Sequence, residues 1–195
     1  MDSIQKLIDI FRRFPTVGPR TASRFVYYLL KLPKEKTDDL ITAIQELRDR
    51  IKLCQLCFNP FEGEQSICPI CQNPLRNKGL LCIVEKESDL LSIENTKKYN
   101  GLYFILGGTV AMLKKDDLNN LRIAELKKRI KENSFSEIII ALNPTPEGKA
   151  TADLVIKAIK EKPLKITHLG LGLPIGAELE YADEETLENA FKSRR

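Results

Sequence analysis

Four of the five cysteines form two pairs whose spacing suits a metal ion. Two residues separate Cys54 from Cys57 and Cys68 from Cys71, and ten residues lie between the pairs. Two such Cys-x-x-Cys pairs at short separation supply four thiolates for tetrahedral zinc. Because sulfur then occupies every ligand position, no position is left for a reacting water, so we expect one structural Zn²⁺ per chain. The fifth cysteine, Cys82, lies in an apolar run and is expected to pack in a core.

A second set of polar residues follows two apolar runs that are typical of buried parallel strands. Glu85 follows the run at 80–84, and Asn143 and Glu147 follow the run at 138–142. Open α/β sheets bind ligands at the carboxyl ends of their strands, so we expect these three side chains to meet at one rim. A magnesium site there would want several carboxylates, and this turn offers only one. The rim therefore favours partner docking or weak binding of a divalent cation over phosphoryl transfer.

Residues 80–195 alternate short apolar runs with helical patterns. We expect strands at 80–84, 102–106, 138–142 and 165–169, and helices at 88–93, 123–130, from 149 onward and at 183–192. This alternation predicts a mostly parallel sheet covered by helices, since parallel strands need long crossover connections. His168, the only histidine, lies in the last apolar run, so we interpret it as a packed or capping residue and not as a general base.

Residues 1–53 have the spacing of helices. Apolar residues recur three and four apart from Ile4 to Phe11, a turn follows at 14–19, and a second helix opens at Gly18 and Pro19. A third helix is expected from about residue 38, with one apolar face. This segment is therefore predicted to be a small helical domain.

The N-terminus of the second helix is a candidate phosphate site. Free amides at a helix N-terminus point outward, and the dipole there favours an anion. Arg20 and Arg24 lie on the face of this helix that is opposite its apolar residues. They would contact a nucleic-acid backbone without reading its sequence. A helical corner used only for packing or oligomerisation is the alternative.

The charge of the chain is concentrated in its first quarter. Residues 1–53 hold 11 Lys and Arg against 7 Asp and Glu, which is the whole net surplus of +4. A basic segment of this kind indicates a polyanion partner or, alternatively, a solvated helical surface. No apolar run reaches the roughly 20 residues of a membrane span, and the N-terminus has no signal-peptide pattern, so we expect a cytoplasmic protein.

The order of these segments resembles one bacterial family, the RecR recombination mediators. The resemblance rests on the strings at 16–22, 106–108, 143–151 and 172–181 and on the four cysteines. It implies an α/β protein with four parts. These are a helix-hairpin-helix domain for DNA binding or oligomerisation at 1–53, a four-cysteine zinc finger at 54–79, a Toprim domain at 80–172, and a C-terminal tail with a helix at 173–195.

Three residues at two sites depart from the patterns that the resemblance invokes. In the Toprim domain of topoisomerases and primases, the later turn carries an Asp-x-Asp pair, whereas this chain has Asn143 and Thr145 and keeps Glu85 and Glu147. Thr16 stands where a helix-hairpin-helix motif has its first glycine. Both departures concern the details of a site and leave the resemblance in place.

The resemblance implies a non-enzymatic mediator of recombinational DNA repair. Members of the family form ring-like homotetramers, dimers of dimers, that can encircle DNA. They work with RecO and RecF to load RecA on gapped or single-stranded DNA, and are nucleoid-associated during repair. Carried over to this chain, Arg20 and Arg24 would face DNA, and Glu85, Asn143 and Glu147 would form a Toprim rim that helps to recruit RecO. The alternatives are a magnesium-dependent Toprim nuclease or primase-like enzyme, and a zinc-stabilised adaptor that binds only protein.

Overall fold

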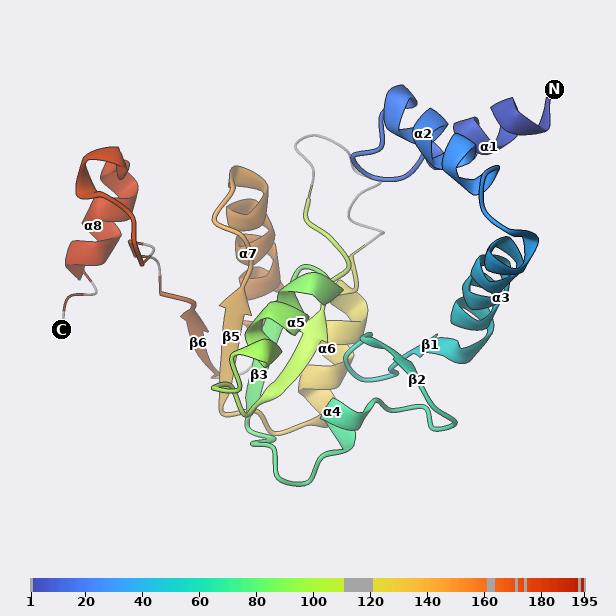
Figure 1. Cartoon of the computed structure of the whole chain (residues 1–195). Coiled ribbons are helices and arrows are strands. Elements are labelled where there is room, and N and C mark those ends of the chain that lie inside the picture. Colours follow the sequence, from blue (N-terminus) through green and yellow to red (C-terminus); the bar gives the residue numbers. More distant parts are fainter. Residues whose placement is uncertain are drawn as a thin grey trace. The chain divides into compact units, whose positions relative to one another are not determined.

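The computed structural model describes residues 2–110, 121–160, 164–170, 172–173, 175–192 and 194 (Figure 1). The chain divides into two compact units, Met1–Ile51 and Lys52–Arg195. Among the residues described, no helix is both long and apolar enough to cross a membrane.

The first unit consists of helices α1 (Ser3–Phe11), α2 (Pro19–Leu29) and α3 (Lys34–Arg50). The Asp2 side chain caps α1 by accepting a hydrogen bond from the amide of Ile4, and Pro19 occupies the first turn of α2, where no intrahelical donor is needed. Helices α1 and α2 pack together through an edge-to-face contact between Phe11 and Phe25, whose ring centroids lie 5.7 Å apart. The helical domain expected at the N-terminus is confirmed.

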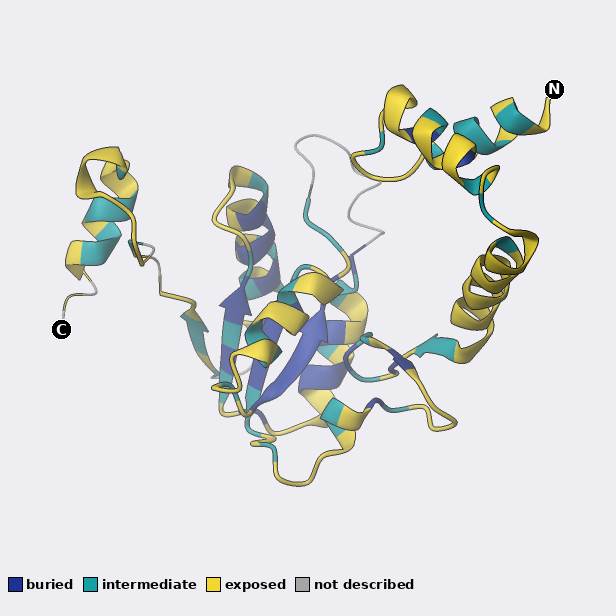
Figure 2. Cartoon of the chain, viewed as in Figure 1, coloured by how far each residue is buried: buried dark blue, intermediate teal, exposed yellow. Residues whose placement is uncertain are grey.

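Helix α3 differs from the prediction in its start and in its surroundings. It begins at Lys34, about four residues before the expected position, because the helix can start directly after Pro33. Its apolar face exists, but the other helices of the first unit leave much of it exposed. Leu40, Ile41, Ile44 and Leu47 expose between 42 and 64% of their surface (Figure 2).

The turn between α1 and α2 places Thr16 in a left-handed conformation, with φ at 62°. Gly18, by contrast, is the N-cap of α2 with φ at −81°, which any residue can adopt. The residue that stands in place of the motif's first glycine is therefore the strained one, because a β-branched side chain is disfavoured in this region.

Thr16→Gly should stabilise the first unit by about 1 kcal/mol, since glycine removes the steric conflict at positive φ. Native-state hydrogen exchange of the α2 amides in the full-length protein measures this, and exchange should slow by about fivefold. Gly18→Ala is the control and should not slow exchange, because a β-carbon there meets nothing within 4 Å and alanine is a poorer N-cap than glycine, at a cost of about 0.5 kcal/mol. Faster exchange in Thr16→Gly would show that the threonine contacts outweigh the strain.

The second unit is built on a four-stranded parallel sheet with the order β4-β3-β5-β6. Its strands are β3 (Leu80–Val84), β4 (Leu102–Ile105), β5 (Glu137–Ala141) and β6 (Lys165–His168). The other elements of the unit are β1 (Ile51–Leu53), β2 (Pro60–Glu62), α4 (Pro69–Gln72), α5 (Glu87–Asn95), α6 (Ile123–Glu132), α7 (Pro146–Ile159), a 3₁₀ turn (Leu179–Tyr181) and α8 (Glu184–Lys192). The predicted α/β class and parallel sheet are confirmed.

Helices cover both faces of this sheet, which is why β3, β4 and most of β5 are apolar, whereas the edge strand β6 carries polar residues. Alternate residues of β3, such as Leu81 and Ile83, pack with α6 and α7 on one face. Cys82 and Val84 point to the other face, where Leu90 of α5 contributes. Cys82 is 1% exposed, as expected of a core residue, and the buried strands are visible at the centre of the sheet in Figure 2.

His168 ends β6 and is exposed at the carboxyl edge of the sheet. The packed interpretation of this residue is therefore wrong. Its apolar neighbours in sequence misled the prediction, because an edge strand exposes polar residues at its end even when the run around it is apolar.

Candidate functional site

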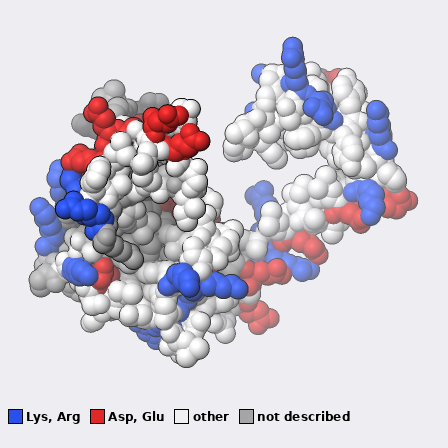
Figure 3. Space-filling model, turned by 60° about the vertical axis from the view of Figure 1, so that its left-hand side comes forward, with Lys and Arg blue, Asp and Glu red and all other residues white. Residues whose placement is uncertain are grey.

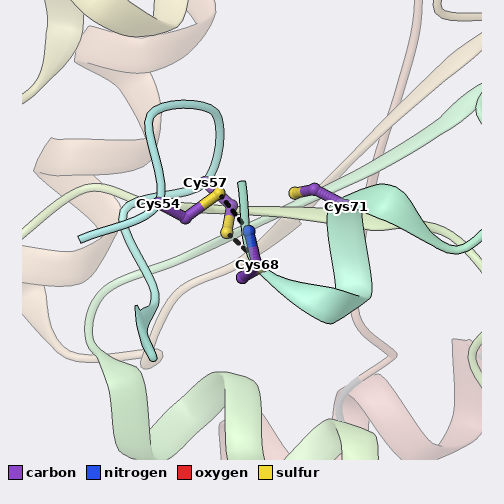
Figure 4. A group of neighbouring side chains, drawn as sticks. All are labelled: Cys54, Cys57, Cys68 and Cys71. Carbon is purple, nitrogen blue, oxygen red and sulfur yellow. Dashed lines mark hydrogen bonds between the residues drawn. The ribbon is translucent and has the colours of Figure 1, made fainter. Parts of the chain in front are cut away.

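The two cysteine pairs come together in one cluster within the second unit. Their four Sγ atoms all lie within 4.8 Å of one another. The Sγ atoms of Cys57 and Cys68 are 3.5 Å apart. Cys54, Cys57 and Cys68 are completely buried, and Cys71 is partly buried. Figure 4 shows the four side chains pointing toward one another. Four sulfurs at this spacing can hold a metal ion.

Short local elements place each cysteine. Cys54 and Cys57 lie in the loop that joins β1 to β2, where the amide of Phe58 donates to the carbonyl of Cys54 over 2.9 Å. Cys68 caps the single turn of α4, and Cys71 lies within that turn. The spacing of two residues inside each pair thus brings both sulfurs of a tight turn to the same side.

Backbone amides donate to the sulfurs, as expected where thiolates must be stabilised. The amide of Cys68 donates to Cys54 Sγ over 3.3 Å, and that of Asn59 donates to Cys57 Sγ over 3.5 Å. Hydrogen bonds from the thiols of Cys57, Cys68 and Cys71, in that order, lower the pKa of Cys54, whereas the hydrogen bond to Cys54 raises the pKa of Cys57 and of Cys71. The four thiols therefore do not all ionise by themselves, and a bound cation would be needed to hold four thiolates together.

The cysteine loop also lies along the β4 edge of the large sheet. The amide of Ile105 in β4 donates to the carbonyl of Cys57 over 3.0 Å. The ring of Phe58 packs edge-to-face on Phe104, with centroids 5.4 Å apart, and the guanidinium of Arg122 lies over the Phe58 ring, 4.6 Å from its centroid. A sheet edge left open would expose unpaired backbone groups, so the cysteine loop protects it.

The carboxyl rim of the sheet brings Glu85 and Asn143 into contact. Asn143 Nδ2 donates to Glu85 Oε2 over 2.9 Å, although the two residues are 58 positions apart in sequence. Glu147 is half-buried at the second residue of α7 and shows no side-chain partner among the contacts of the described residues. In the part of the chain that is described, the four cysteines are the only set of three or more His, Cys, Asp or Glu residues close enough to hold an ion. The rim therefore joins a carboxylate to an amide and does not gather several carboxylates.

A close backbone approach shapes this rim at Gly148. Its amide donates to Thr145 Oγ1 over 3.1 Å, which caps α7, and a β-carbon on Gly148 would overlap the carbonyl oxygen of Asn143. Backbone atoms cannot move aside as a flexible side chain can. Only glycine at this position lets the chain turn from β5 into α7 while Asn143 reaches Glu85.

Gly148→Ala should therefore destabilise the second unit by about 2 kcal/mol, the usual range for overpacking against a rigid neighbour. Urea unfolding of the full-length protein, followed by circular dichroism, measures the change. Gly170→Ala is the matched control, because a β-carbon there meets nothing within 4 Å. Equal stability of the two variants would mean that the turn relaxes freely.

Arg20 and Arg24 are exposed on α2, one turn apart, and neither forms an ion pair among the described residues. The stretch 10–34 holds six Lys and Arg and no Asp or Glu, a pattern that the sequence interpretation did not use. In Figure 3, blue side chains stand out on the upper part of the N-terminal unit, where little red is visible. Arg12 pairs with Asp9, which lies just before this stretch, but Arg20 and Arg24 have no such partner among the described residues and so suit a polyanion.

The fold and these sites define a class of protein with a helix-hairpin-helix unit, a four-cysteine cluster and a Toprim-like sheet. Residues 4–48 match the family described as RecR, helix-hairpin-helix; residues 79–170 match the Toprim domain; residues 172–195 match RecR, C-terminal.

Similar proteins cover the same length. The chain is 41% identical to the recombination protein RecR of Bifidobacterium adolescentis and 42% identical to that of Rubrobacter xylanophilus. In both cases the match spans 99% of this chain and 96% of the relative. The recombination protein RecR of Cutibacterium acnes is 37% identical over 98% of this chain and 94% of its own length. The chain belongs to the RecR family of recombination proteins.

Proposed function

We propose that the chain is a non-enzymatic, DNA-binding mediator of recombinational repair. The observation that supports DNA binding is the basic stretch 10–34. Within it, Arg20 and Arg24 are exposed on α2 and form no ion pair in the described structure. Membership of the RecR family ties that binding to recombination. The segments 1–53, 54–79, 80–172 and 173–195 act as a DNA-binding or oligomerisation domain, a zinc finger, a Toprim domain and a C-terminal tail.

The metal of the cysteine cluster is one structural Zn²⁺ in this proposal. Cys54, Cys57, Cys68 and Cys71 supply four sulfur ligands, a donor set that selects zinc over harder cations. The bound ion would link the β1–β2 loop to α4 and leave no open coordination position. Its contribution is to folding and not to a reaction.

The chain acts as a clamp formed by a homotetramer, a dimer of dimers. The exposed apolar face of α3 supports self-association, because a second chain that packs on Leu40, Ile41, Ile44 and Leu47 would shield them from water. With RecO and RecF the clamp helps to load RecA on gapped or single-stranded DNA, in the cytoplasm and at the nucleoid during repair.

The rim residues support a docking role over catalysis. Two-metal phosphoryl transfer needs several carboxylates to hold its cations. Here the carboxylate of Glu85 accepts a hydrogen bond from the side-chain amide of Asn143. Asn143 and Thr145 also replace the aspartate pair of catalytic Toprim domains. Glu85, Asn143 and Glu147 are therefore proposed to contact RecO.

Glu147→Ala should weaken RecO binding by about tenfold, as expected for a partner contact, while DNA affinity stays within twofold of wild type. Surface plasmon resonance with immobilised RecO and, separately, immobilised DNA measures both. Glu132→Ala removes the same charge from the last residue of α6, which precedes the amino end of β5 and so lies away from the carboxyl rim, and should change neither affinity. A loss of DNA affinity in Glu147→Ala would place nucleic acid at the rim instead.

The deciding experiment compares gapped circular DNA with the same DNA linearised, in the presence of magnesium. We expect the protein to stay on circles, to leave linear ends and to cut neither form. Retention and strand breaks can be read on one gel. Magnesium-dependent breaks would overturn the non-enzymatic role, and equal loss from circles and linear DNA would overturn the clamp.

A further inference from the structure

Arg129 is a buried cation at the junction of the cysteine loop and the sheet. It lies on α6, is 5% exposed, and its Nη1 donates both to the carbonyl of Leu56, over 2.5 Å, and to the carbonyl of Tyr103, over 2.6 Å. Leu56 belongs to the first cysteine knuckle and Tyr103 to the edge strand β4. One guanidinium therefore ties the loop to the sheet beside the direct bond between Ile105 and Cys57.

No carboxylate of the described residues forms an ion pair with Arg129. Glu125 and Glu132 line a shallow groove together with Arg129, but Glu132 pairs with Lys128 at 3.9 Å, and neither glutamate pairs with Arg129. A buried charge without a partner is strongly unfavourable, so proteins normally pair such a group. The nearby carboxylates therefore do not supply the anionic partner that a buried arginine needs.

The anionic group that Arg129 does approach is the cysteine cluster. Its Nη2 lies 3.9 Å from Cys71 Sγ, and hydrogen bonds to metal thiolates are typically long because sulfur is large. Four thiolates around a divalent ion carry a net double negative charge, which a nearby buried cation would offset. The missing partner is supplied if a metal is bound.

We propose that Arg129 is the buried counter-cation of the four-cysteine metal centre and couples metal occupancy to the seating of the cysteine loop along β4. The inference rests on the proposed binding of zinc by the cluster. With the metal bound, the tetrathiolate charge neutralises Arg129, and its donors hold Leu56 and Tyr103 together. Without the metal, the same guanidinium keeps its two carbonyl acceptors and its contact with the Phe104 ring, but it loses the charge of the tetrathiolate centre.

Three variants separate charge from hydrogen bonding and packing. Arg129→Met removes the charge and keeps most of the side-chain length, and Arg129→Lys keeps the charge without the planar fork. Arg122→Met is the matched control: Arg122 also lies on the α6 side, donates to a β4 carbonyl, Ile105, and covers Phe58 of the cysteine loop, but it forms no contact with a cysteine sulfur in the described structure.

The first measurement is the rate at which zinc-loaded protein transfers its metal to excess chelator, followed with a chromogenic zinc indicator. Release from Arg129→Met should be faster than from wild type by about tenfold or more, the usual effect of losing a partner of a metal ligand. Arg129→Lys should lie between them, and Arg122→Met should match wild type. Equal release from Arg129→Met and wild type would overturn the inference.

The second measurement is a thermodynamic cycle that combines two changes, the substitution Arg129→Met and the removal of zinc. The unfolding midpoint is measured for all four combinations. Arg129→Met should lower the unfolding midpoint of the zinc-loaded protein and should raise, or leave unchanged, that of the metal-free protein. A merely structural arginine would shift both midpoints equally, as Arg122→Met is expected to do, and that result would contradict the proposal. If the metal-free protein does not fold, the release rates decide.

The two ways of failing are distinguishable. Freshly purified wild-type protein without zinc that also fails to bind added zinc would refute the proposed metal centre itself. Stoichiometric zinc with unaltered release from Arg129→Met would leave the metal centre in place and refute only the role of Arg129.

Discussion

Cys57→Ser is expected to abolish stoichiometric zinc and to unfold the cysteine loop. Structural zinc sites supply about 10–16 kcal/mol of apparent binding free energy in small zinc peptides, and this energy is coupled to folding. Cys57 is completely buried, its carbonyl accepts from Ile105 of β4, and its sulfur meets Cys68. Loss of this ligand should therefore loosen both the cluster and the edge of the sheet.

Metal content and local order are the two measurements for this variant. Plasma emission spectrometry should find about one zinc per chain in wild type and much less in Cys57→Ser. Limited proteolysis should cut the variant between residues 54 and 72, whereas we expect the same segment to resist cleavage in wild type because three of its cysteines are buried. Cys82→Ala is the matched control, because it removes a buried thiol outside the cluster and should keep the metal. Full zinc in Cys57→Ser would refute the four-sulfur site.

Arg20→Ala combined with Arg24→Ala should weaken DNA binding by about a hundredfold, regardless of sequence. Each arginine is expected to make a charge-assisted bond to phosphate of about 1.5 kcal/mol, and the two together correspond to that factor. Because two phosphate contacts are lost, the plot of log affinity against log salt should become shallower by about two. The stretch around them contains no acidic residue that could already hold these cations.

Fluorescence anisotropy with labelled single-stranded and duplex DNA, over a range of salt, measures both effects. The control is Arg48→Ala with Arg50→Ala, which removes the same charge from the last turn of α3. It should keep affinity within a few-fold, since charge at a distance is screened at physiological salt. Equal losses in the two double variants would show that only net charge matters, and unchanged binding in the first would place the DNA site elsewhere.

The strands and helices were largely predictable because their signals are local. The run at 80–84 became β3 with the expected bounds, and β5 differs from the prediction by one residue. Helix α7 was expected from residue 149 and begins at Pro146, because Thr145 caps it through Gly148. The capping residue Thr145 determines where α7 begins, whereas the apolar periodicity predicted only the middle of the helix.

Burial was less predictable than element type. The apolar spacing of α3 correctly indicated a helix, but periodicity states only that one face is apolar and not whether anything covers it. Similarly, an apolar neighbourhood in sequence did not bury His168. Thr16 shows the same limit, since its left-handed backbone is imposed by the turn and is opposed by its own side chain.

By itself, the sequence determined the four-cysteine pattern, the alternation of strands and helices, the basic first quarter and the resemblance to RecR, because each depends on residue types at short spacing. Only the tertiary structure decided that Asn143 meets Glu85, that the cysteine loop lies along β4, and that Arg129 lies beside Cys71. Arg129 and Leu56 are 73 positions apart. Contacts across such separations arise from the packing of the whole sheet, in which β4 becomes an edge and α6 lies against it, and no local pattern encodes them.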